Sequence, residues 1–467
     1  MLSHFPRYFS TRAIVCYLVT LALVSCIFMN YAMPFQFMLF GFIPVCVFFV
    51  FSNKLTVTWQ SYSDHLFTKK LFFTALIIRI VCVLFLYFYF LENTGQPFTY
   101  AAGDEIQYQY SASLWRLESF DRYWKELMTF FKLGDRGYVV WLGLEYYILG
   151  PHVLTARILK CFIDAFSCVL MYNLAKRGFG EPVGRMTAIF CLLMPNMWYY
   201  CGLTLKETEM AFMTILFVER GDFALRAKKI SFQNIILPGL IILVMFTFRT
   251  PLAAVLAAAL VGALILSSGK QLKAWKKVLY SAVFAVWMFL TVGAEIKEET
   301  QQLWEGRETN QTEGYAWRAE REGGNTFAQY ATAAVFAPFI FTIPFSSMVA
   351  VLNQENQMMM NGANFIKNVL SGLTIFALVI LLIRGDWRKH VLPIAVTCGY
   401  LVVLVFSNFA HSERFHFPIL AFELMFAAYG VSMLKNKHKR WYVIWLVFVC
   451  VANIAWAWIK LAGRGMV

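Results

Sequence analysis

Charged residues are scarce in this sequence. Only 15% of the 467 residues are Asp, Glu, Lys or Arg, against about 25% in a soluble globular chain. Hydrophobic residues make up 60%, and the mean hydropathy is +0.59. The shortage of charge excludes an ordinary soluble protein, and the aromatic excess is typical of chains that contact lipid and its interface. We therefore expect an all-α, polytopic integral membrane protein.

Motifs for nucleotide, dinucleotide and serine-hydrolase chemistry are also missing. The sequence contains no P-loop, no GxGxxG and no GxSxG. None of the ten cysteines stands in a CxxC or Cys/His metal spacing, so we interpret them as small apolar core residues. The histidines show no close metal-ligand spacing. We therefore predict neither a metal ion nor a cofactor.

Long apolar runs predict about thirteen transmembrane helices. The stretch between Arg12 and Lys54 has no charge, is interrupted at Pro34 and is long enough for two crossings. Its first run is too long for the core of a cleavable signal peptide, so we expect a signal anchor. A third crossing, 71–91, contains Arg79, which is either functional or snorkels to the cytoplasmic end. The remaining crossings are expected near 153–174, 183–203, 206–222, 233–248, 251–268, 279–295, 368–384, 391–408, 416–434 and 441–460.

Basic residues indicate the orientation of these spans. If the apolar segment 333–352, which contains two prolines, does not cross, then the short segments rich in Lys and Arg all face the cytoplasm. The N-terminus is then inside, and two polar segments, 92–152 and 295–330, are outer loops. Topology thus accounts for the formal net charge of +14, and we predict contact with membrane lipid and not with nucleic acid.

The outer loop 92–152 combines acidic and amphipathic features. Asp104 and Glu105 are adjacent carboxylates in a polar, aromatic stretch that lies between two apolar spans. Apolar side chains then recur at i, i+3, i+4 and i+7 from Trp124 to Phe131, with basic residues on other faces. This pattern predicts a helix lying in the membrane surface. Acidic residues held at the membrane mouth by surface helices indicate a reaction centre.

Other charged residues are predicted at the same outer level as these acids. They are Arg157, Lys206, Glu207, Arg249, His411 and Arg414. Acids gathered with several cations at one depth suit a site that binds a phosphate and deprotonates a hydroxyl.

Four of these residues also have a structural explanation. Arg157 and Asp164 share one helical face and can form a buried ion pair. Arg249 can snorkel to the membrane surface. Lys206 can be interfacial, with Glu207 merely its partner.

Four segments carry a resemblance to a known family. The first long outer loop with Asp104 and Glu105 looks like the acidic motif of the GT-C-fold membrane glycosyltransferases. The nearest group is that of protein mannosyltransferases and aminoarabinose transferases, with its bacterial RgtA/B/C/D-like branch. Residues 151–159 resemble the span that follows the loop, residues 176–180 the basic cytoplasmic turn, and residues 412–418 the late outer loop.

The resemblance implies a domain plan and an activity. Residues 71–435 would form a GT-C-like catalytic core, preceded by a transmembrane hairpin and linker (1–70) and followed by a C-terminal transmembrane helix (436–467). The protein would move a sugar from a polyprenyl-phosphate donor to a glycan, lipid or protein acceptor. The reaction would take place on the outer face of a bacterial cytoplasmic membrane.

The resemblance also suggests roles for the site residues. Asp104 would take the acceptor's proton and Glu105 would assist or position it. Arg157, Lys206, Arg249 and Arg414 would be candidates for the carrier phosphate. Glu207 and His411 would complete the substrate-binding set. The chemistry would be an inverting single displacement that needs no metal.

Two other functions stay open at this point. A polymerase or ligase of lipid-linked glycans would be expected to centre on arginines and a histidine in a large late outer loop, whereas the loop 411–416 is short. A transporter or flippase of a lipid-linked sugar would be favoured by discontinuous helices paired across two halves of the chain, and none is evident.

Overall fold

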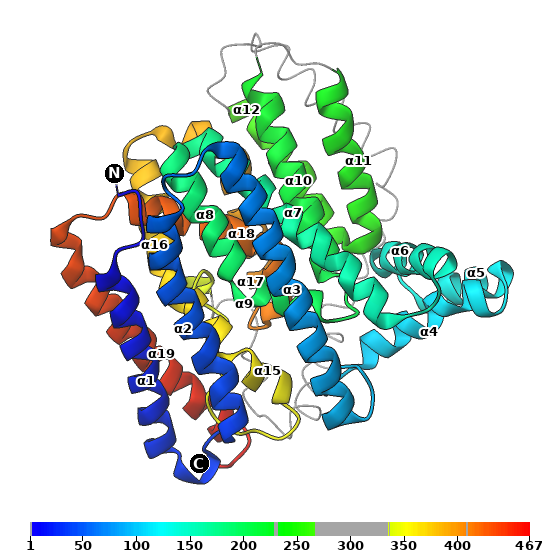
Figure 1. Ribbon diagram of the computed structural model, residues 1–467, viewed down its shortest axis with the longest axis horizontal. Helices are drawn as coiled ribbons and strands as arrows, with labels where there is room; N and C mark the ends of the chain where they lie inside the picture. The colour runs from blue at the N-terminus through cyan, green and yellow to red at the C-terminus, as the bar shows by residue number, and fades with distance from the viewer. Residues whose placement is uncertain (1, 228–231, 267–334, 336, 408–409) are drawn as a thin grey trace.

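The computed structural model describes residues 2–227, 232–266, 335, 337–407 and 410–467 (Figure 1). Within these ranges the regular elements are helices, which confirms the all-α prediction. Seven helical segments there are long and apolar enough to cross a membrane. They are Arg7–Ile27 (α1), Phe35–Thr58 (α2), Asp64–Thr94 (α3), Asn361–Ile383 (α16), Asp386–Val405 with α17 (Val391–Val405), Glu413–Ser432 (α18) and Asn436–Ala462 with α19 (Lys439–Ala462).

The middle of the chain forms shorter or more polar helices. They are α7 (Val153–Phe179), α8 (Glu181–Leu193), α9 (Pro195–Cys201), α10 (Glu207–Arg226), α11 (Phe232–Phe248) and α12 (Thr250–Leu266). The segment 183–203 is not one continuous helix, because α8 ends before Pro195, which has no N–H to donate, and α9 begins there. Whether this segment crosses the membrane stays a prediction. The predicted crossing 279–295 and outer loop 295–330 lie outside the described residues, so the number thirteen stays a prediction.

Segment 333–352 was expected not to cross the membrane. From 337 to 353 the described chain contains one short 3₁₀ turn, Ala337–Phe339, and otherwise irregular backbone. Its end reaches the turn between α1 and α2, where the Ala350 N–H donates to the Tyr31 carbonyl oxygen at 2.9 Å. No described part of this segment is a helix of membrane-spanning length.

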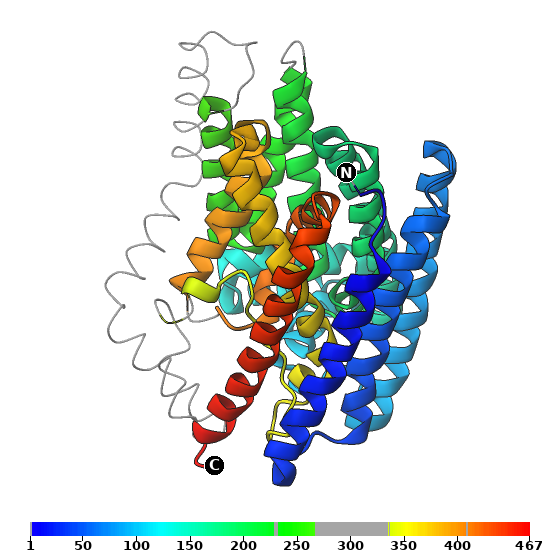
Figure 2. The same ribbon diagram turned by 90° about the vertical axis from the view of Figure 1, so that its left-hand side faces the viewer.

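The two ends of the chain pack side by side. Helix α19 lies along α1 in both Figure 1 and Figure 2. The Tyr442 hydroxyl donates to the Phe9 carbonyl oxygen at 3.1 Å, and the Tyr31 hydroxyl donates to the Met466 carbonyl oxygen at 2.8 Å. The N-terminal hairpin and the C-terminal helix, predicted as flanking segments, therefore contact each other.

Helix α3 lies on the outside of the bundle and carries one buried charge on its inner face. It starts after Ser63, whose hydroxyl accepts from the Leu66 N–H, and it ends at Gly95, whose φ of 73° suits glycine. Arg79, halfway along, is fully buried and forms an ion pair with Asp164 of α7. The snorkelling explanation of Arg79 is therefore wrong, because this arginine has a carboxylate partner inside the protein.

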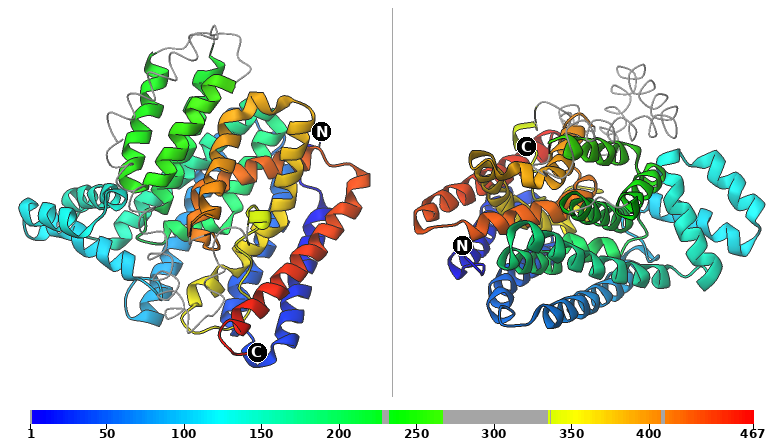
Figure 3. Two further views of the ribbon diagram at one scale, coloured as in Figure 1. Left: turned by 180° about the vertical axis from the view of Figure 1, so that it is seen from behind. Right: turned by 90° about the horizontal axis from the view of Figure 1, so that it is seen from above.

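The segment 92–152, which was predicted to be an outer loop, contains three helices that project from the bundle (Figure 3). They are α4 (Gly103–Leu117), α5 (Phe120–Phe130) and α6 (Leu133–Leu149). The predicted amphipathic helix is α5, which buries Tyr123 and Leu127 and leaves Trp124 and Met128 exposed. An exposed apolar face on a short polar helix is what a membrane-surface helix requires.

Candidate functional site

A cavity of about 570 Å³ lies where these outer helices meet the bundle. Its walls come from four separate parts of the chain: 99–105, 199–205, 353–357 and 411–415. The predicted site residues among its lining are Asp104, Glu105, His411 and Arg414. The fold thus brings the early acidic motif and the late basic loop to one place.

Asp104 and Glu105 point in different directions because they begin a helix. Both stand in the first turn of α4, where carboxylates are favourable beside the positive end of the helix dipole. Consecutive helical residues do not share a face. The side chain of Asp104 is 56% exposed, whereas that of Glu105 is 1% exposed.

Glu105 is held by four hydrogen bonds. One oxygen accepts from the Thr99 N–H at 3.1 Å and from the Thr99 hydroxyl at 2.7 Å. The other accepts from the Thr204 N–H at 2.7 Å and from Arg157 Nη2 at 3.2 Å. This carboxylate is therefore occupied in joining the loop before α4 to the segment before α10.

Arg157 is the buried partner of Glu105. Its side chain is fully buried, and its guanidinium also donates to the Thr204 hydroxyl at 3.2 Å. The alternative pairing of Arg157 with Asp164 is wrong, because Asp164 is bonded to Arg79. Arg157 does not line the cavity itself, but it is hydrogen-bonded to Glu105, which does.

Arg414 connects the two remaining acids. Its Nη1 bonds to a carboxylate oxygen of Asp104, and its Nε bonds to a carboxylate oxygen of Glu207. Glu207 is fully buried in the first turn of α10. The idea that Glu207 is merely the partner of Lys206 is therefore wrong. Asp104, Arg414 and Glu207 form one charged cluster, with Asp104 at its exposed end.

Lys206 lies next to this cluster but faces a different set of groups. Its ammonium forms an ion pair with Asp135 of α6 and donates to the carbonyl oxygens of Gly134 and Phe248, both at 2.6 Å. Burial raises the pKa of Asp135, but the Lys206 ammonium outweighs it and holds that pKa below its usual value. Lys206 therefore joins α6 to the turn between α11 and α12.

Arg249 lies in the turn between α11 and α12, between the two predicted spans 233–248 and 251–268. Its guanidinium carbon lies 4.2 Å from the centre of the Phe415 ring, and its Nη1 is 3.5 Å from the Tyr400 hydroxyl. Phe415 lines the cavity, so Arg249 stands behind an aromatic wall. Neither Arg249 nor Lys206 lines the cavity in this structure.

The sequence interpretation missed one wall of the cavity. Asn353, Gln354, Asn356 and Gln357 all line it, and Lys460 of α19 donates to the side-chain oxygen of Gln354 at 2.7 Å. The run Asn-Gln-Glu-Asn-Gln at 353–357 is conspicuously polar for this chain. This cluster of polar residues is the sequence signal from which this wall of the cavity could have been predicted.

An apolar groove of about 400 Å³ adjoins this cavity. It lies between α2, α3, α9 and the start of α16, and its lining includes Leu39, Phe40, Phe85 and Trp198. Tyr199 lines both the groove and the charged cavity. The charged cavity and the apolar groove therefore lie next to each other at Tyr199.

The described residues contain no group of three or more His, Cys, Asp or Glu side chains placed to hold a metal ion. Fold and site together define a helical membrane protein with a charged cavity beside an apolar groove. Comparisons with protein-family models, with curated proteins and with solved structures found no match. The resemblance to GT-C glycosyltransferases therefore stays a prediction.

Proposed function

We propose that this protein is a glycosyltransferase that moves a sugar from a polyprenyl-phosphate donor to an acceptor on the outer face of the cytoplasmic membrane. One observation carries the proposal: the exposed carboxylate of Asp104 and the guanidinium of Arg414 share a cavity that adjoins an apolar groove at Tyr199. A base, a phosphate ligand and a place for a lipid tail are the three parts that such a transfer needs.

The donor fits the two spaces in one orientation. Its isoprenoid chain lies in the groove beside Phe40 and Phe85, where apolar contact stabilises it. Its phosphate lies near Arg414, and its sugar fills the charged cavity. A volume of about 570 Å³ is within the usual range for small-molecule sites.

Binding of the donor rearranges the charged cluster. In the structure, the single positive charge of Arg414 is shared between the two carboxylates of Asp104 and Glu207. An arriving phosphate takes the place of Asp104 on the guanidinium, because arginine binds phosphate by a similar fork of N–H donors. This exchange releases Asp104 towards the acceptor, while Glu207 keeps Arg414 in position.

The transfer is then a single displacement. The acceptor's oxygen or nitrogen forms a bond to the anomeric carbon as the bond from that carbon to the phosphate oxygen breaks. The acceptor's proton passes to Asp104, and the bonding electrons leave with the phosphate. Arg414 stabilises the charge that grows on the leaving phosphate. The sugar carbon is inverted, and polyprenyl phosphate is released.

Purified protein incubated with labelled polyprenyl-phosphate sugars and a cell-envelope extract that supplies the acceptor tests the proposal. Wild-type protein should consume the lipid-linked sugar, and Asp104→Asn should reduce the rate by about 10²- to 10⁴-fold. Asp121→Asn is the matched control, because Asp121 is an exposed carboxylate of α5 outside the cavity. A loss below about tenfold in Asp104→Asn, or an equal loss in the control, would reject Asp104 as the base.

A transporter of lipid-linked sugars is a second candidate, and the Arg79–Asp164 pair favours it. Ionisable groups buried within a membrane span often mark a transport or proton pathway. Both side chains are at most 1% exposed. In sealed vesicles a transporter would move the labelled lipid between leaflets without breaking its sugar–phosphate bond, whereas the proposed transferase would release free carrier.

A further inference from the structure

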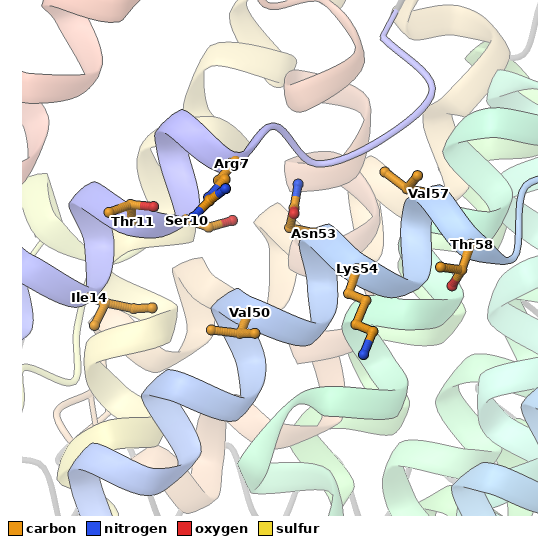
Figure 4. Close-up of a pocket in the computed structure, with 9 residues that line it drawn as sticks. All are labelled: Arg7, Ser10, Thr11, Ile14, Val50, Asn53, Lys54, Val57 and Thr58. Carbon is orange, nitrogen blue, oxygen red and sulfur yellow. The ribbon is translucent and has the colours of Figure 1, made fainter.

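A second cavity, of about 500 Å³, lies between α1 and α2 at the opposite end of the bundle from the charged site. Figure 4 shows that its lining residues come from the start of α1 and the last turns of α2. They are Arg7, Ser10, Thr11, Ile14, Val50, Asn53, Lys54, Val57 and Thr58. None of them belongs to the proposed catalytic site.

The N-terminal segment fixes the shape of this cavity. The Asn53 amide donates to the Phe5 carbonyl oxygen at 2.6 Å, and the Phe5 N–H donates to the Thr56 hydroxyl at 3.0 Å. Phe5 itself is fully buried. These bonds tie the chain before α1 to α2, so the two walls of the cavity hold a fixed spacing.

One end of the cavity is cationic and polar. Arg7 stands on the α1 side of the gap, and Lys54 extends from α2 with its ammonium turned away from Arg7, over the Phe51 ring (Figure 4). Within the described part of the chain, neither is in an ion pair with a carboxylate. The Ser10 side chain lies at the gap and is 3% exposed, and its hydroxyl has no hydrogen-bond partner among the described residues. A buried hydroxyl without a hydrogen-bond partner destabilises the folded state. The Ser10 hydroxyl lines a cavity in which a bound molecule can supply that partner.

The other end of the cavity is apolar. Ile14 and Val50 lie one to two turns deeper along their helices than the two cations, and Val50 is 47% exposed. In the predicted topology the cationic end is at the cytoplasmic membrane surface and the apolar end is inside the bilayer. The cavity therefore has the polarity of a phospholipid: anion-binding at the surface and apolar below it.

We propose that this cavity binds an anionic phospholipid of the cytoplasmic leaflet. Its phosphate binds beside Arg7, and the exposed Lys54 side chain turns from its orientation in Figure 4 towards the same phosphate. An oxygen of the headgroup or glycerol accepts from the Ser10 hydroxyl, and one acyl chain runs along Ile14 and Val50. The lipid joins α1 to α2 at the end where Arg7 and Lys54 have no ion-pair partner among the described residues.

Native mass spectrometry of the purified full chain tests this site, with phosphatidylglycerol and phosphatidylcholine of identical acyl chains as probes. The double variant Arg7→Gln/Lys54→Gln should weaken phosphatidylglycerol binding about fivefold per charge removed, or roughly 25-fold in total. Binding of phosphatidylcholine should change little. The matched control Arg12→Gln/Lys70→Gln removes two nearby cations that stack on Tyr8 and Tyr62, outside the cavity. It should bind within about twofold of wild type.

A second variant distinguishes the contribution of the cavity's shape to lipid binding from that of its two positive charges. Val50→Trp fills the apolar end while keeping both cations, and it should also abolish preferential phosphatidylglycerol binding. Wild-type affinity in both cavity variants would overturn the proposal, as would an equal loss in the control. Displacement of the lipid by inorganic phosphate at millimolar concentration would overturn the lipid assignment in favour of a soluble anion.

Discussion

Replacing Glu105 by Gln tests how the two adjacent acids divide their roles. The change keeps the shape of the side chain but removes its charge and converts one acceptor oxygen into a donor. Glu105 accepts two hydrogen bonds at each oxygen, from Thr99 on one side and from Thr204 and Arg157 on the other. Whichever way the amide turns, its NH₂ group faces donors.

The loss of folding stability in Glu105→Gln follows from the burial of Glu105 and Arg157. Arg157 is fully buried, and its other terminal nitrogen has no hydrogen-bond partner within the described residues. Removal of the carboxylate therefore leaves an unpaired charge inside the protein, which costs about 3–5 kcal/mol in comparable cases. Asp104→Asn should cost less than about 1 kcal/mol, because Asp104 is largely exposed and its arginine partner keeps Glu207.

Unfolding in mixed detergent micelles, followed by tryptophan fluorescence, measures both free energies. The double variant Glu105→Gln/Arg157→Met removes the orphaned charge and should recover part of the loss. If Glu105→Gln unfolds with wild-type free energy, Glu105 does not hold the loop and the division of roles is wrong. If Asp104→Asn is the destabilised variant, the roles are reversed.

Three further predictions follow from the contacts and the topology. Arg414→Lys should raise the apparent KM for the lipid donor and lower kcat, because lysine lacks the planar set of N–H donors that binds a phosphate and Glu207 together. Arg249→Lys should change donor kinetics little, because Phe415 separates Arg249 from the cavity. Burial raises the pKa of Glu145 in α6 to about 7, so the folded protein binds more protons than the unfolded chain between about pH 4.5 and 7. Thermal stability should therefore fall as the pH rises through this window, and Glu145→Gln should remove that part of the slope. A cysteine at Thr94 should be labelled from outside the cell and one at Lys437 should not; labelling at Lys437 would reverse the predicted topology of the last spans.

Apolar periodicity and helix breakers predicted most of the described helices. The hairpin turn at 248–251 is present between α11 and α12, and the amphipathic pattern from Trp124 is helix α5. The span 183–203 is broken before Pro195, whereas α2, α11 and α18 continue through Pro44, Pro238 and Pro418. A proline weakens a helix, but whether the helix kinks or ends there depends on its packing, so this break was not predictable from the sequence alone.

Partners of the charged residues were not predictable from the sequence. Helical spacing brought Arg157 and Asp164 onto one face, but each pairs with a residue of a different element, because tertiary packing decides between candidate partners. Arg79 and Asp164 are 85 residues apart, and Asp104 and Arg414 are 310 apart. The depth of a charge follows from topology, whereas its partner depends on which helices are neighbours.

Mass analysis of cell-surface glycans most directly tests the claim that this protein transfers a sugar outside the cytoplasmic membrane. Cells lacking the protein should lose one sugar from a surface glycan, lipid or protein, and should accumulate the corresponding polyprenyl-phosphate sugar. Wild-type protein and Asp121→Asn should restore the modification, and Asp104→Asn should not, although it reaches the membrane in equal amount. Full restoration by Asp104→Asn, or surface glycans of unchanged mass without the protein, would contradict the account.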